Sequence, residues 1–579
     1  MSSDVSRETL ASVLEEIALL LEIEGENPFK IRAYRQGAET VRSFDGDIVD
    51  LARKGELEGI KGIGKALQDK LHELASTGRL GFHENLRGNY PDTFFELFEI
   101  DGLGPKKVAA VHKKLGIDSI DSLRKACEAG ELAALPGFAK KTEQKILEAI
   151  ERREQFADRF HLDVAAHAAE VILERLRDHP DVLRAQYAGS LRRSKETVGD
   201  LDFIVATSKP AELTRFFAEM DLTENVIVQG DTKCSIHLEN GLQCDLRAVS
   251  NDEYPFALQY FTGSKEHNVA LRSRALKQGL SLNEYGFTGK GEIPEVHDER
   301  DIYKALGLDF IDPALRENRG EIEAAEEGTL PDLVSWEQLC GTFHNHTTAS
   351  DGRDTLEEMA AAAIDLGLSY LGIADHSKAS FQARGLDEER LKAQIDEITQ
   401  WNRDHGDSLR IFSGSEVDIL KDGSLDFDDE MLAQLDYCVV SVHNAFTLDE
   451  KAMTKRIIRA MENEHVTMLG HLTGRLLLRR DEYAVNHEKI IDCAAKTRTI
   501  IELNCNPWRL DMDWRWWKKA RDKGVLCSIN PDAHRGENFQ YLRFGADVAR
   551  KGWLRKQDVV NTMNRDDIEE FLQKPKSQR

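Results

Sequence analysis

The sequence predicts a multidomain protein of mixed class, with a helical N-terminal region, an α+β middle part and a C-terminal α/β barrel. Glycine-containing turns between helical segments mark the first part. An Asp-x-Asp strand followed by a hairpin pattern marks the second. In the third, short apolar strands that end in histidine or acidic residues alternate with helical segments. A chain of 579 residues is long enough for three or more such domains.

Composition excludes several classes of protein. No run approaches the ~18 apolar residues that a membrane span needs. The N-terminus also lacks the basic segment followed by an apolar core that would indicate a secretory signal. The 8 cysteines are scattered without a Cys-x-x-Cys pair, which is typical of a reduced cytoplasm. A net charge of −26 argues against a general nucleic-acid coat, because phosphate binding requires Lys and Arg. We expect a cytoplasmic protein without membrane contact, in which any DNA contacts are local.

Repeated glycine turns in the N-terminal region predict binding to the DNA backbone. Residues 57–71 read LEGIKGIGKALQDKL and residues 100–115 read IDGLGPKKVAAVHKKL, and both resemble the helix-hairpin-helix motif. Their glycines let backbone N–H groups approach a phosphate without reading sequence. A weaker third copy, residues 135–147, carries Ala139 in place of the second glycine. One such hairpin is often only a tight helix connection, but the repetition favours DNA binding. The predicted contacts are Gly62, Gly64, Lys65, Gly102, Gly104 and Lys106.

The stretch from 189 to 205, GSLRRSKETVGDLDFIV, carries paired carboxylates. Side chains alternate along a strand, so Asp200 and Asp202 share one face and repel each other unless a divalent cation holds them. A bare Asp-x-Asp is more often a polar strand edge. However, residues 235–246 read as a hairpin with an Asn-Gly turn, which sets Asp245 on a strand that can lie beside the first pair. Three carboxylates at one edge indicate nucleotidyl transfer by two metal ions.

The surrounding residues narrow this prediction to a family. Gly-Ser ahead of a helix start offers backbone N–H groups to a phosphate, and either of the next two arginines can add a charged contact. Gly-Ser, Gly-Asp-x-Asp and a later strand aspartate resemble the nucleotidyltransferase palm of family X DNA polymerases. Residues 260–287, YFTGSKEHNVALRSRALKQGLSLNEYGF, are similar to the thumb of that family. The resemblance implies that Asp200, Asp202 and Asp245 bind Mg²⁺ or Mn²⁺, with Asp245 as general base.

The same resemblance implies the contacts to substrate. Tyr260 and Phe261 line the sugar of the incoming dNTP, and Arg272 contacts the template strand. Ser194 stands where relatives often have glycine, so we expect a slightly different turn there. Lys265 replaces an acidic residue of animal relatives. The nucleotide-binding residues implied are Gly189, Ser190, Arg193, Gly199, Tyr260, Phe261, Gly263 and Asn268.

Lys70 is a candidate for a second reaction in the N-terminal region. Eukaryotic relatives bind the 5′-phosphate of a gap there and remove deoxyribose phosphate through a lysine Schiff base. Counted from the first Gly-x-Gly turn, Lys70 falls at the place of that lysine, and Lys65 is a candidate neighbour. The alternative is a lysine on a solvated helix face. The sequence leaves both open.

The C-terminal half carries many candidate metal ligands. His344-x-His346 on a strand points both rings to one face, a spacing suited to a metal. The other candidates follow at the ends of apolar strands, where an α/β barrel places its active site. Ligands at so many strand ends are unlike isolated core histidines. The nine candidates are His344, His346, Asp351, His376, Glu416, His443, His471, Asp532 and His534.

This pattern resembles the polymerase and histidinol phosphatase (PHP) domain, a distorted seven-stranded barrel with three metals. The resemblance implies one ion on His344, His346, Glu416 and Asp532, a second on Asp351, His376 and His534, and a third on His443 and His471 with Glu416 bridging. Mixed His and carboxylate ligands favour Mn²⁺ or Zn²⁺, and clustered ions favour phosphodiester hydrolysis. Arg475 and Arg509 are candidates either for binding substrate phosphate or for salt bridges within the domain.

Together the resemblances imply a bacterial family X DNA polymerase that fills short gaps in base excision repair. Its partners are gapped or primer-template DNA and dNTPs, and we expect a monomer, located at the nucleoid when on DNA. The PHP domain would act as a 3′–5′ exonuclease, and a further activity as an abasic-site endonuclease stays open. One alternative is a PHP phosphoesterase on a polymerase scaffold that only binds DNA, and another is a non-enzymatic repair scaffold.

Domain limits follow from these motifs. We expect residues 151–177 to form a helix that leads into the palm, and residues 312–331 to form either a linker or a short docking helix. The predicted segments are 1–90 (N-terminal helical domain), 91–155 (second DNA-binding region), 156–248 (palm), 249–318 (thumb), 319–338 (linker) and 339–575 (PHP domain).

Overall fold

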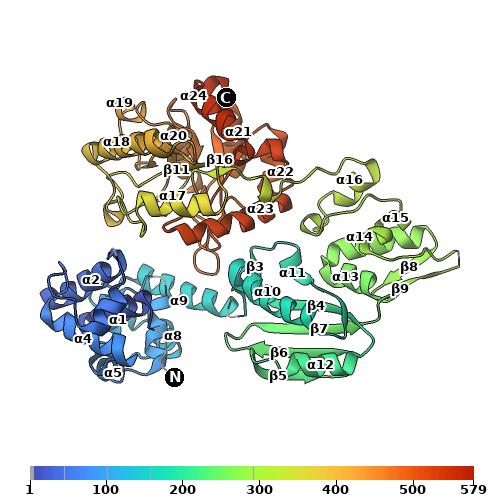
Figure 1. The fold of residues 1–579 in the computed structure, drawn as a ribbon, viewed down its shortest axis with the longest axis horizontal. Coiled ribbons are helices and arrows are strands. Elements are labelled where there is room, and N and C mark those ends of the chain that lie inside the picture. The colour runs from blue at the N-terminus through green and yellow to red at the C-terminus, as the bar shows by residue number, and fades with distance from the viewer. Residues whose placement is uncertain (1–4, 45, 101, 157, 291) are drawn as a thin grey trace. The chain divides into compact units, whose positions relative to one another are not determined.

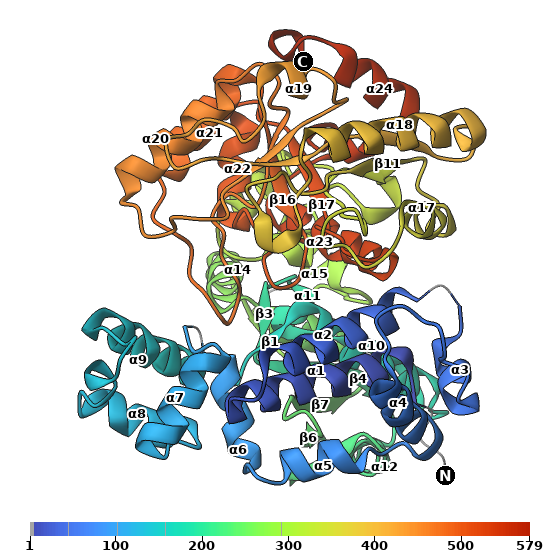
Figure 2. The same cartoon turned by 90° about the vertical axis from the view of Figure 1, so that its left-hand side faces the viewer.

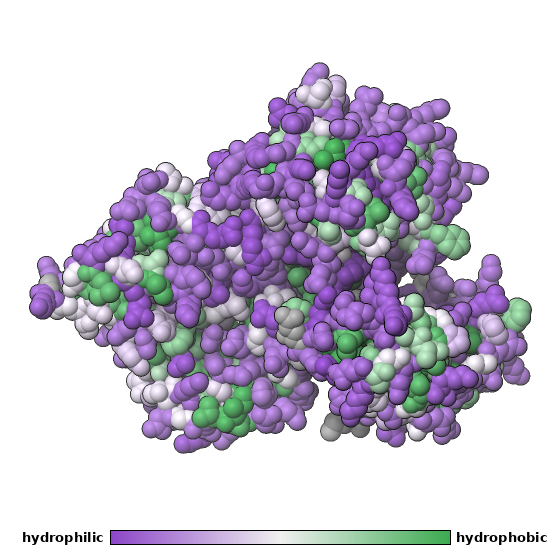
Figure 3. Space-filling view, turned by 180° about the vertical axis from the view of Figure 1, so that it is seen from behind, coloured by the Kyte–Doolittle hydropathy of each residue, from purple (hydrophilic) through white to green (hydrophobic). Residues whose placement is uncertain are grey.

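The computed structural model describes residues 5–44, 46–100, 102–156, 158–290 and 292–579. The chain divides into two compact units, Met1–Ala157 and Asp158–Arg579. Within the described ranges, no helix combines the length and the apolar character that a membrane crossing requires. The face in Figure 3 is mainly hydrophilic with scattered apolar patches, as expected for a chain with 31% charged residues.

The first unit is helical. Its longest helix, α1 (Arg7–Glu24), buries an apolar stripe at helical spacing that includes Leu10, Leu14, Ile17 and Leu21. The other helices pack around this stripe to form one core. They are α2 (Pro28–Ser43), α3 (Ile48–Lys54), α4 (Lys65–Thr77), α5 (Gly81–Arg87), α6 (Asp92–Phe95), α7 (Pro105–Leu115), α8 (Ile120–Glu128) and α9 (Lys140–Gln155), with the short turns η1 (Glu96–Glu99) and η2 (Leu132–Ala134) (Figure 1).

The palm contains a five-stranded sheet in the order β2-β4-β7-β6-β5, in which only β4 and β7 run parallel to each other. Its strands are β2 (Val182–Tyr187), β4 (Asp200–Thr207), β5 (Thr223–Gln229), β6 (Lys233–Leu238) and β7 (Gln243–Val249). Helices α10 (Leu162–Asp178) and α12 (Pro210–Ala218) share a core with Phe203 and Val205. Helix α13 (Tyr254–Thr262) packs on the other face against Ile204 and Ala206.

The continuous helix expected over residues 151–177 is wrong. Helix α9 ends at Gln155, and α10 begins only at Leu162. Between them β1 (Phe160–His161) pairs with β3 (Thr197–Val198). Because this partner lies far away in the sequence, the helical pattern on either side gave no sign of the break.

The thumb is built by α13, α14 (Lys265–Lys277), the hairpin β8 (Leu280–Asn283) and β9 (Gly286–Gly289), and α15 (Glu299–Ala305). Of the two readings for residues 312–331, the docking helix is the one observed. Helix α16 (Glu321–Glu327) buries Ile322 and Ala325 in the core of the thumb. Its Glu321 accepts a fully buried bond from the Nδ1 of His267 at 2.7 Å.

The C-terminal part is an α/β domain with parallel strands (Figure 2). One sheet contains β10 (Gly341–Thr342), β11 (Tyr370–Ile373) and β12 (Arg410–Ser413). The other contains β13 (Glu416–Asp418), β14 (Val439–Ser441), β15 (Met468–Leu469), β16 (Ile500–Asn504) and β17 (Cys527–Asn530). Isolated parallel bridges, Asn345 to Ala533 and His376 to Glu416, join the two sheets. The predicted strands are therefore confirmed, and the seven-stranded closure stays a prediction.

Helices cover these strands in alternation with them, as the sequence pattern indicated. They are α17 (Leu356–Asp365), α18 (Glu388–His405), α19 (Asp429–Leu432), α20 (Glu450–Met461), α21 (His487–Thr497), α22 (Trp514–Asp522), α23 (Leu542–Lys551) and α24 (Arg565–Gln573). Most candidate ligands follow the carboxyl ends of parallel strands, which align at one edge of the domain. Glu416, at the start of β13, joins them through its bridge to His376.

Candidate active sites

Three turns of the first unit have the same backbone geometry. Gly62, Gly102 and Gly137 have φ of +96°, +87° and +89°, values that an L side chain rarely adopts. The residues two positions later cap α4, α7 and α9 without a side-chain hydrogen bond, which leaves backbone N–H groups of the first turn to a ligand; in α7 these begin after Pro105, which has no N–H. These caps are Gly64, Gly104 and Ala139. Ala139 is tolerated because its φ is −90°. The third copy is thus structurally equivalent to the other two.

The second turn lines a cavity of about 420 Å³ that also contains basic side chains. Lys106 is exposed there, and Lys107 is drawn back to the carbonyl of Gly102 at 2.7 Å. Lys65 is exposed at the start of α4. The predicted DNA contacts of this unit therefore lie at helix N-termini with accessible lysines.

Lys70 lies on α4 beside an aromatic pair. Its Nζ is 4.8 Å from the centre of the Phe82 ring, which stacks on Tyr34. The ammonium group of Lys30 lies 5.9 Å from the same ring. Lys30 therefore shares this ring with Lys70, and Lys65 as a neighbour of Lys70 stays a prediction.

The three palm aspartates lie on adjacent parallel strands. Asp202 on β4 is directly opposite Asp245 on β7, as predicted, while Leu201 and Phe203 are buried on the other face. Burial and the charges of Asp200 and Asp245 raise the pKa of Asp202 to about 7. Burial and Asp245 also raise the pKa of Asp200. Carboxylates that repel each other in this way are suited to divalent cations.

Gly189 brings the candidate phosphate-binding turn against Asp202. Its φ is +62°, and a Cβ there would lie 2.4 Å from Asp202 Oδ2. The backbone N–H of Ala188 donates to the Asp202 carbonyl at 2.7 Å. Helix α11 (Gly189–Arg192), which includes Ser190, thus begins beside the acidic site, so a phosphate bound there would lie close to the metals. Gly199 precedes β4.

Arg193 connects the palm to the thumb. Its Nε donates to Glu317 Oε1 at 3.1 Å, and its guanidinium also donates to the Thr262 carbonyl beside Gly263. The next residue, Ser194, has φ of +54°, a left-handed conformation that favours glycine. The turn after α11 therefore keeps the shape that glycine would support.

The remaining nucleotide and template residues lie on α13 and α14. Tyr260 and Phe261 contact each other edge to face, with centroids 5.2 Å apart. Asn268 is oriented by two bonds, one to the Tyr260 carbonyl at 2.7 Å and one from Gln259 at 2.8 Å. Arg272 and Lys265 are exposed on α14.

Glu416 is the centre of the C-terminal site. Buried at the start of β13, it lies between imidazoles from other strand ends: 2.9 Å from His471 Nε2, 3.2 Å from His443 Nε2 and 3.4 Å from His344 Nε2 through Oε1. Through Oε2 it lies 2.8 Å from His376 Nδ1. Burial opposes ionisation, but the surrounding imidazoles hold the pKa of Glu416 well below its usual range.

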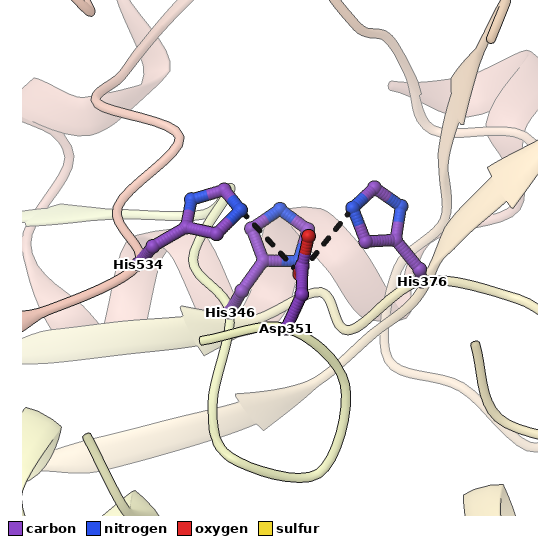
Figure 4. Close-up of side chains that lie close together, drawn as sticks. All are labelled: His346, Asp351, His376 and His534. Atoms are coloured by element: carbon purple, nitrogen blue, oxygen red, sulfur yellow. Dashed lines mark ion pairs between the residues drawn. The ribbon is translucent and has the colours of Figure 1, made fainter. Parts of the chain in front are cut away.

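Asp351 gathers a second group of ligands (Figure 4). Its Oδ1 lies 3.4 Å from His534 Nε2 and 3.5 Å from His376 Nε2, with His346 Nδ1 at 4.0 Å. Asp532 connects this group to the first, because its Oδ1 lies 3.2 Å from His346 Nε2 and 3.8 Å from His344 Nε2. All nine predicted ligands therefore come together, although His346 lies near both groups.

The buried atoms of this site fit metal ions. Several of them make no well-directed hydrogen bond in the described part of the chain, even where an ion-pair partner lies nearby, and this is costly unless a cation occupies the space between them. Three groups of their donor atoms are each close enough to hold one ion. The unpartnered atoms are His344 Nε2, His346 Nδ1 and Nε2, His376 Nδ1, His471 Nδ1 and Glu416 Oε2.

Other residues of the site were not singled out from the sequence. Glu502 is fully buried on β16 and accepts from His344 Nδ1 at 2.7 Å, which turns Nε2 of that ring toward the site. Asp375 accepts bonds from Thr347 and Ser350 and so fixes the loop that carries Asp351. The only sequence signal was a lone acidic residue, within an apolar strand for Glu502 and after one for Asp375.

The two candidate arginines differ in their surroundings. Arg475 is buried and bonded to Asp513 at 2.9 Å and to the Arg509 carbonyl, so it serves within the domain. Arg509 lines a cavity of about 630 Å³ above the ligands and lies 3.4 Å from Asp532. The rim of this cavity includes Phe381, whose side chain is 86% exposed.

Comparisons with known families agree with this geometry. Four parts of the chain match family models. They are a helix-hairpin-helix domain (residues 6–80), a SAM-like helix-hairpin-helix tandem (residues 94–152), a DNA polymerase beta thumb (residues 257–317) and a PHP domain (residues 342–506).

Whole proteins match as well. The chain is 24% identical to DNA polymerase lambda of Rattus norvegicus over 52% of this chain and 55% of that protein. It is 26% identical to a probable phosphatase of a Thermoanaerobacter species over 40% of this chain and 94% of that protein. It is 38% identical to the DNA polymerase/3′-5′ exonuclease PolX of Bacillus subtilis over 98% of this chain and 99% of that protein. The chain therefore belongs to the bacterial family X DNA polymerases with a C-terminal PHP domain.

Proposed function

We propose that this protein fills short gaps in DNA by template-directed polymerisation in base excision repair, and that its PHP domain removes nucleotides from 3′ ends. The observation that carries the polymerase assignment is the pairing of Asp202 with Asp245 beside a glycine turn that excludes a Cβ. The printed names of the Bacillus subtilis and rat relatives support it. We keep the domain limits predicted from the sequence as part of this proposal.

In the polymerase reaction, the 3′-hydroxyl of the primer attacks the α-phosphate of a dNTP and pyrophosphate leaves. Asp245 takes the proton of that hydroxyl, and Asp200 and Asp202 hold the divalent cations, Mg²⁺ or Mn²⁺. When bound, these ions stabilise the charge that develops on the attacking and leaving oxygens. The turn from Gly189 to Arg193 receives the triphosphate, and Tyr260 with Phe261 receives the sugar.

In the PHP domain, the proposed reaction is hydrolysis of a phosphodiester at a 3′ end, with abasic-site cleavage as a further candidate. Up to three Mn²⁺ or Zn²⁺ ions suit the His-rich ligands. When bound, such ions lower the pKa of water and stabilise the phosphoryl transition state. Arg509, at the wall of the cavity, is placed to bind a substrate phosphate.

A gapped duplex with a 5′-labelled primer tests both assignments. Wild type is incubated with Mn²⁺, with and without dNTPs, beside Asp200→Ala/Asp202→Ala and His344→Ala/His346→Ala. We expect the first variant to lose only extension and the second to lose only 3′ degradation. Degradation without extension in all three proteins would leave a PHP phosphoesterase on a DNA-binding scaffold. An abasic-site duplex in the same assay separates endonuclease from exonuclease cleavage.

A deoxyribose phosphate lyase is a second candidate function, favoured by the two ammonium groups at the Phe82 ring. Lys30 would bind the 5′-phosphate while the Lys70 nitrogen forms the Schiff base. Borohydride trapping on a 5′-deoxyribose phosphate substrate tests this, with Lys70→Ala beside wild type. An adduct of equal yield in both proteins would exclude Lys70.

A further inference from the structure

A buried lysine links the PHP domain to the polymerase part of the second unit. Lys551 is the last residue of α23 and has no exposed surface. Its Nζ donates to the Arg193 carbonyl at 2.8 Å, to Glu317 Oε1 at 2.6 Å and to the Ala314 carbonyl at 3.4 Å. One ammonium group of the PHP domain thus satisfies acceptors after α11 of the palm and at the end of the thumb.

The same carboxylate oxygen also holds Arg193. Both Lys551 and the Nε of Arg193 donate to Glu317 Oε1, and the Arg193 guanidinium continues to the Thr262 carbonyl. Without Lys551, the Arg193 carbonyl would lose a buried donor, and Glu317 Oε1 would keep the bond from Arg193 but lose the one from Lys551. Leaving buried acceptors without partners favours a shift of the backbone. The backbone that would shift begins directly after α11, the candidate phosphate-binding helix.

Four cationic side chains lie close to the indole of Trp514 and extend this junction. The charged groups of Lys551, Arg515, Lys195 and Arg319 lie 4.5, 4.7, 5.3 and 5.4 Å from the centre of the Trp514 indole. Lys195 comes from the palm and Arg319 from the end of the thumb, whereas the indole belongs to α22 of the PHP domain.

Two direct contacts complete the junction. Arg515 lies 3.5 Å from Glu196, and Arg319 donates to the Arg515 carbonyl at 3.3 Å. The PHP domain therefore contacts the palm segment 193–196 at Arg193, Lys195 and Glu196. None of these contacts involves a ligand of the PHP metal site.

We propose that Lys551 is a positioning residue for nucleotidyl transfer, which holds the palm segment 193–196 and the end of the thumb so that Arg193 and α11 receive the triphosphate of the incoming dNTP. This inference rests on the proposed polymerase function. It gives the PHP domain a structural role in the polymerase site that is independent of its own hydrolytic chemistry.

The test is the Lys551→Met variant of the full-length protein, assayed for single-nucleotide gap filling. Methionine keeps most of the length and the apolar character of the side-chain stem but removes the charge, the ammonium contact with Trp514 and the three donated bonds. We expect the KM for dNTP to rise roughly tenfold, with a smaller change in kcat, an unchanged Kd for gapped DNA and unchanged 3′ degradation.

Lys576→Met is the matched control. Lys576 is also a buried lysine of the PHP domain, but it donates to the carbonyls of Met461 and Asn463, away from the palm. We expect its KM for dNTP to stay within about twofold of wild type. An equal rise in both variants would show a general loss of stability and overturn the assignment, as would an unchanged KM in Lys551→Met.

Glu317→Gln keeps the inference testable if Lys551→Met does not fold. Glutamine retains the shape of the shared acceptor but removes its charge, so the KM for dNTP should rise here too, and an unchanged KM would count against the proposal. Failure of the proposed function looks different. In that case wild type itself would show no dNTP-dependent extension, whatever happens at position 551.

Discussion

The two candidate sites differ in how much of a metal's coordination the protein itself supplies. In the palm, three carboxylates stand on two neighbouring strands, and the remaining positions are left to phosphates, the primer hydroxyl and water. In the PHP domain, nine candidate ligands surround the same space, and most of them are buried. We therefore expect an exchangeable metal that arrives with substrate in the first site and resident ions in the second.

The electrostatics of the two sites also differ, in a way that matches the difference in their ligands. Like charges at the palm site raise the pKa of Asp202 to about 7, so protons compete with the metal there. In the PHP site, acids and imidazoles neutralise each other. Burial lowers and Glu416 raises the pKa of His443, which reaches about 10, while the pKa of Asp532 falls well below its usual range. Without metal, protonation of Asp202 relieves repulsion in the first site, whereas the second site is stabilised by its own ion pairs.

Removing the central carboxylate of each site has the largest expected effect and tests directly whether the two sites act independently. Asp202→Asn should lower extension by roughly a thousandfold or more and leave 3′ degradation unchanged. Glu416→Gln should do the reverse, because Glu416 contacts four imidazoles. Single-turnover extension and degradation assays measure both. If Asp202→Asn also lowered degradation to that extent, the two sites would not be independent.

Gly189→Ala tests whether the palm site depends on the close approach of the Gly189 backbone to Asp202. Its Cβ would displace Asp202 Oδ2, and misplacement by about 1 Å can lower a rate by roughly a hundredfold. The measurement is the rate of single-nucleotide gap filling. Gly241→Ala is the control, because Gly241 also has a positive φ, +84°, but a Cβ there meets no atom within 4 Å. Equal losses in both variants would point to backbone strain and not to Asp202.

Glu502→Gln tests whether the PHP ligands depend on buried partners behind them. The variant weakens the acceptor that fixes the tautomer of His344, and we expect exonuclease activity or metal affinity to fall about 10- to 100-fold. Metal titration of the activity measures this effect. Asp558→Asn, which changes a buried carboxylate bonded to Arg555 in the same domain, should have little effect. A normal metal response in Glu502→Gln would contradict the role of Glu502.

The pH dependence of stability gives the smallest expected effect. The pKa of Asp202 rises from 3.8 to about 7 on folding, so its stabilisation is complete below pH ~4 and is lost as the pH rises through about 7. The pKa of His443 rises from 6.5 to about 10, so its stabilisation is lost as the pH rises through about 10. Metal binding favours the deprotonated forms at both positions.

Consequently, the rise in Tm on adding Mn²⁺ to metal-free protein should grow between pH 6 and pH 9. A difference of a few degrees is expected for a domain of this size, and thermal unfolding with and without metal measures it. In Asp202→Asn the part of the trend below pH ~7 should disappear. A metal effect that shrinks as the pH rises would contradict these pKa directions.

Local patterns in the sequence were enough to predict most residues of the candidate sites. Strand alternation places Asp200 and Asp202 together, the Asn-Gly hairpin sets Asp245 on a strand, and ligands at the ends of parallel strands meet at one edge, although only the fold lays β7 beside β4. Each of these inferences needs only the direction of a strand and the side on which its residues lie. That information is local, so one sequence contains it.

Tertiary structure decided the features that depend on partners distant in the chain. The break before α10 exists because Phe160 pairs with Val198, and α16 is a docking helix because the thumb core accepts Ile322. Glu502 is recognisable only once His344 lies beside it, and Lys551 only once its ammonium group meets the Glu317 carboxylate. A buried charge acquires its role from the atoms that replace its water, and those atoms are set by the packing of the whole unit.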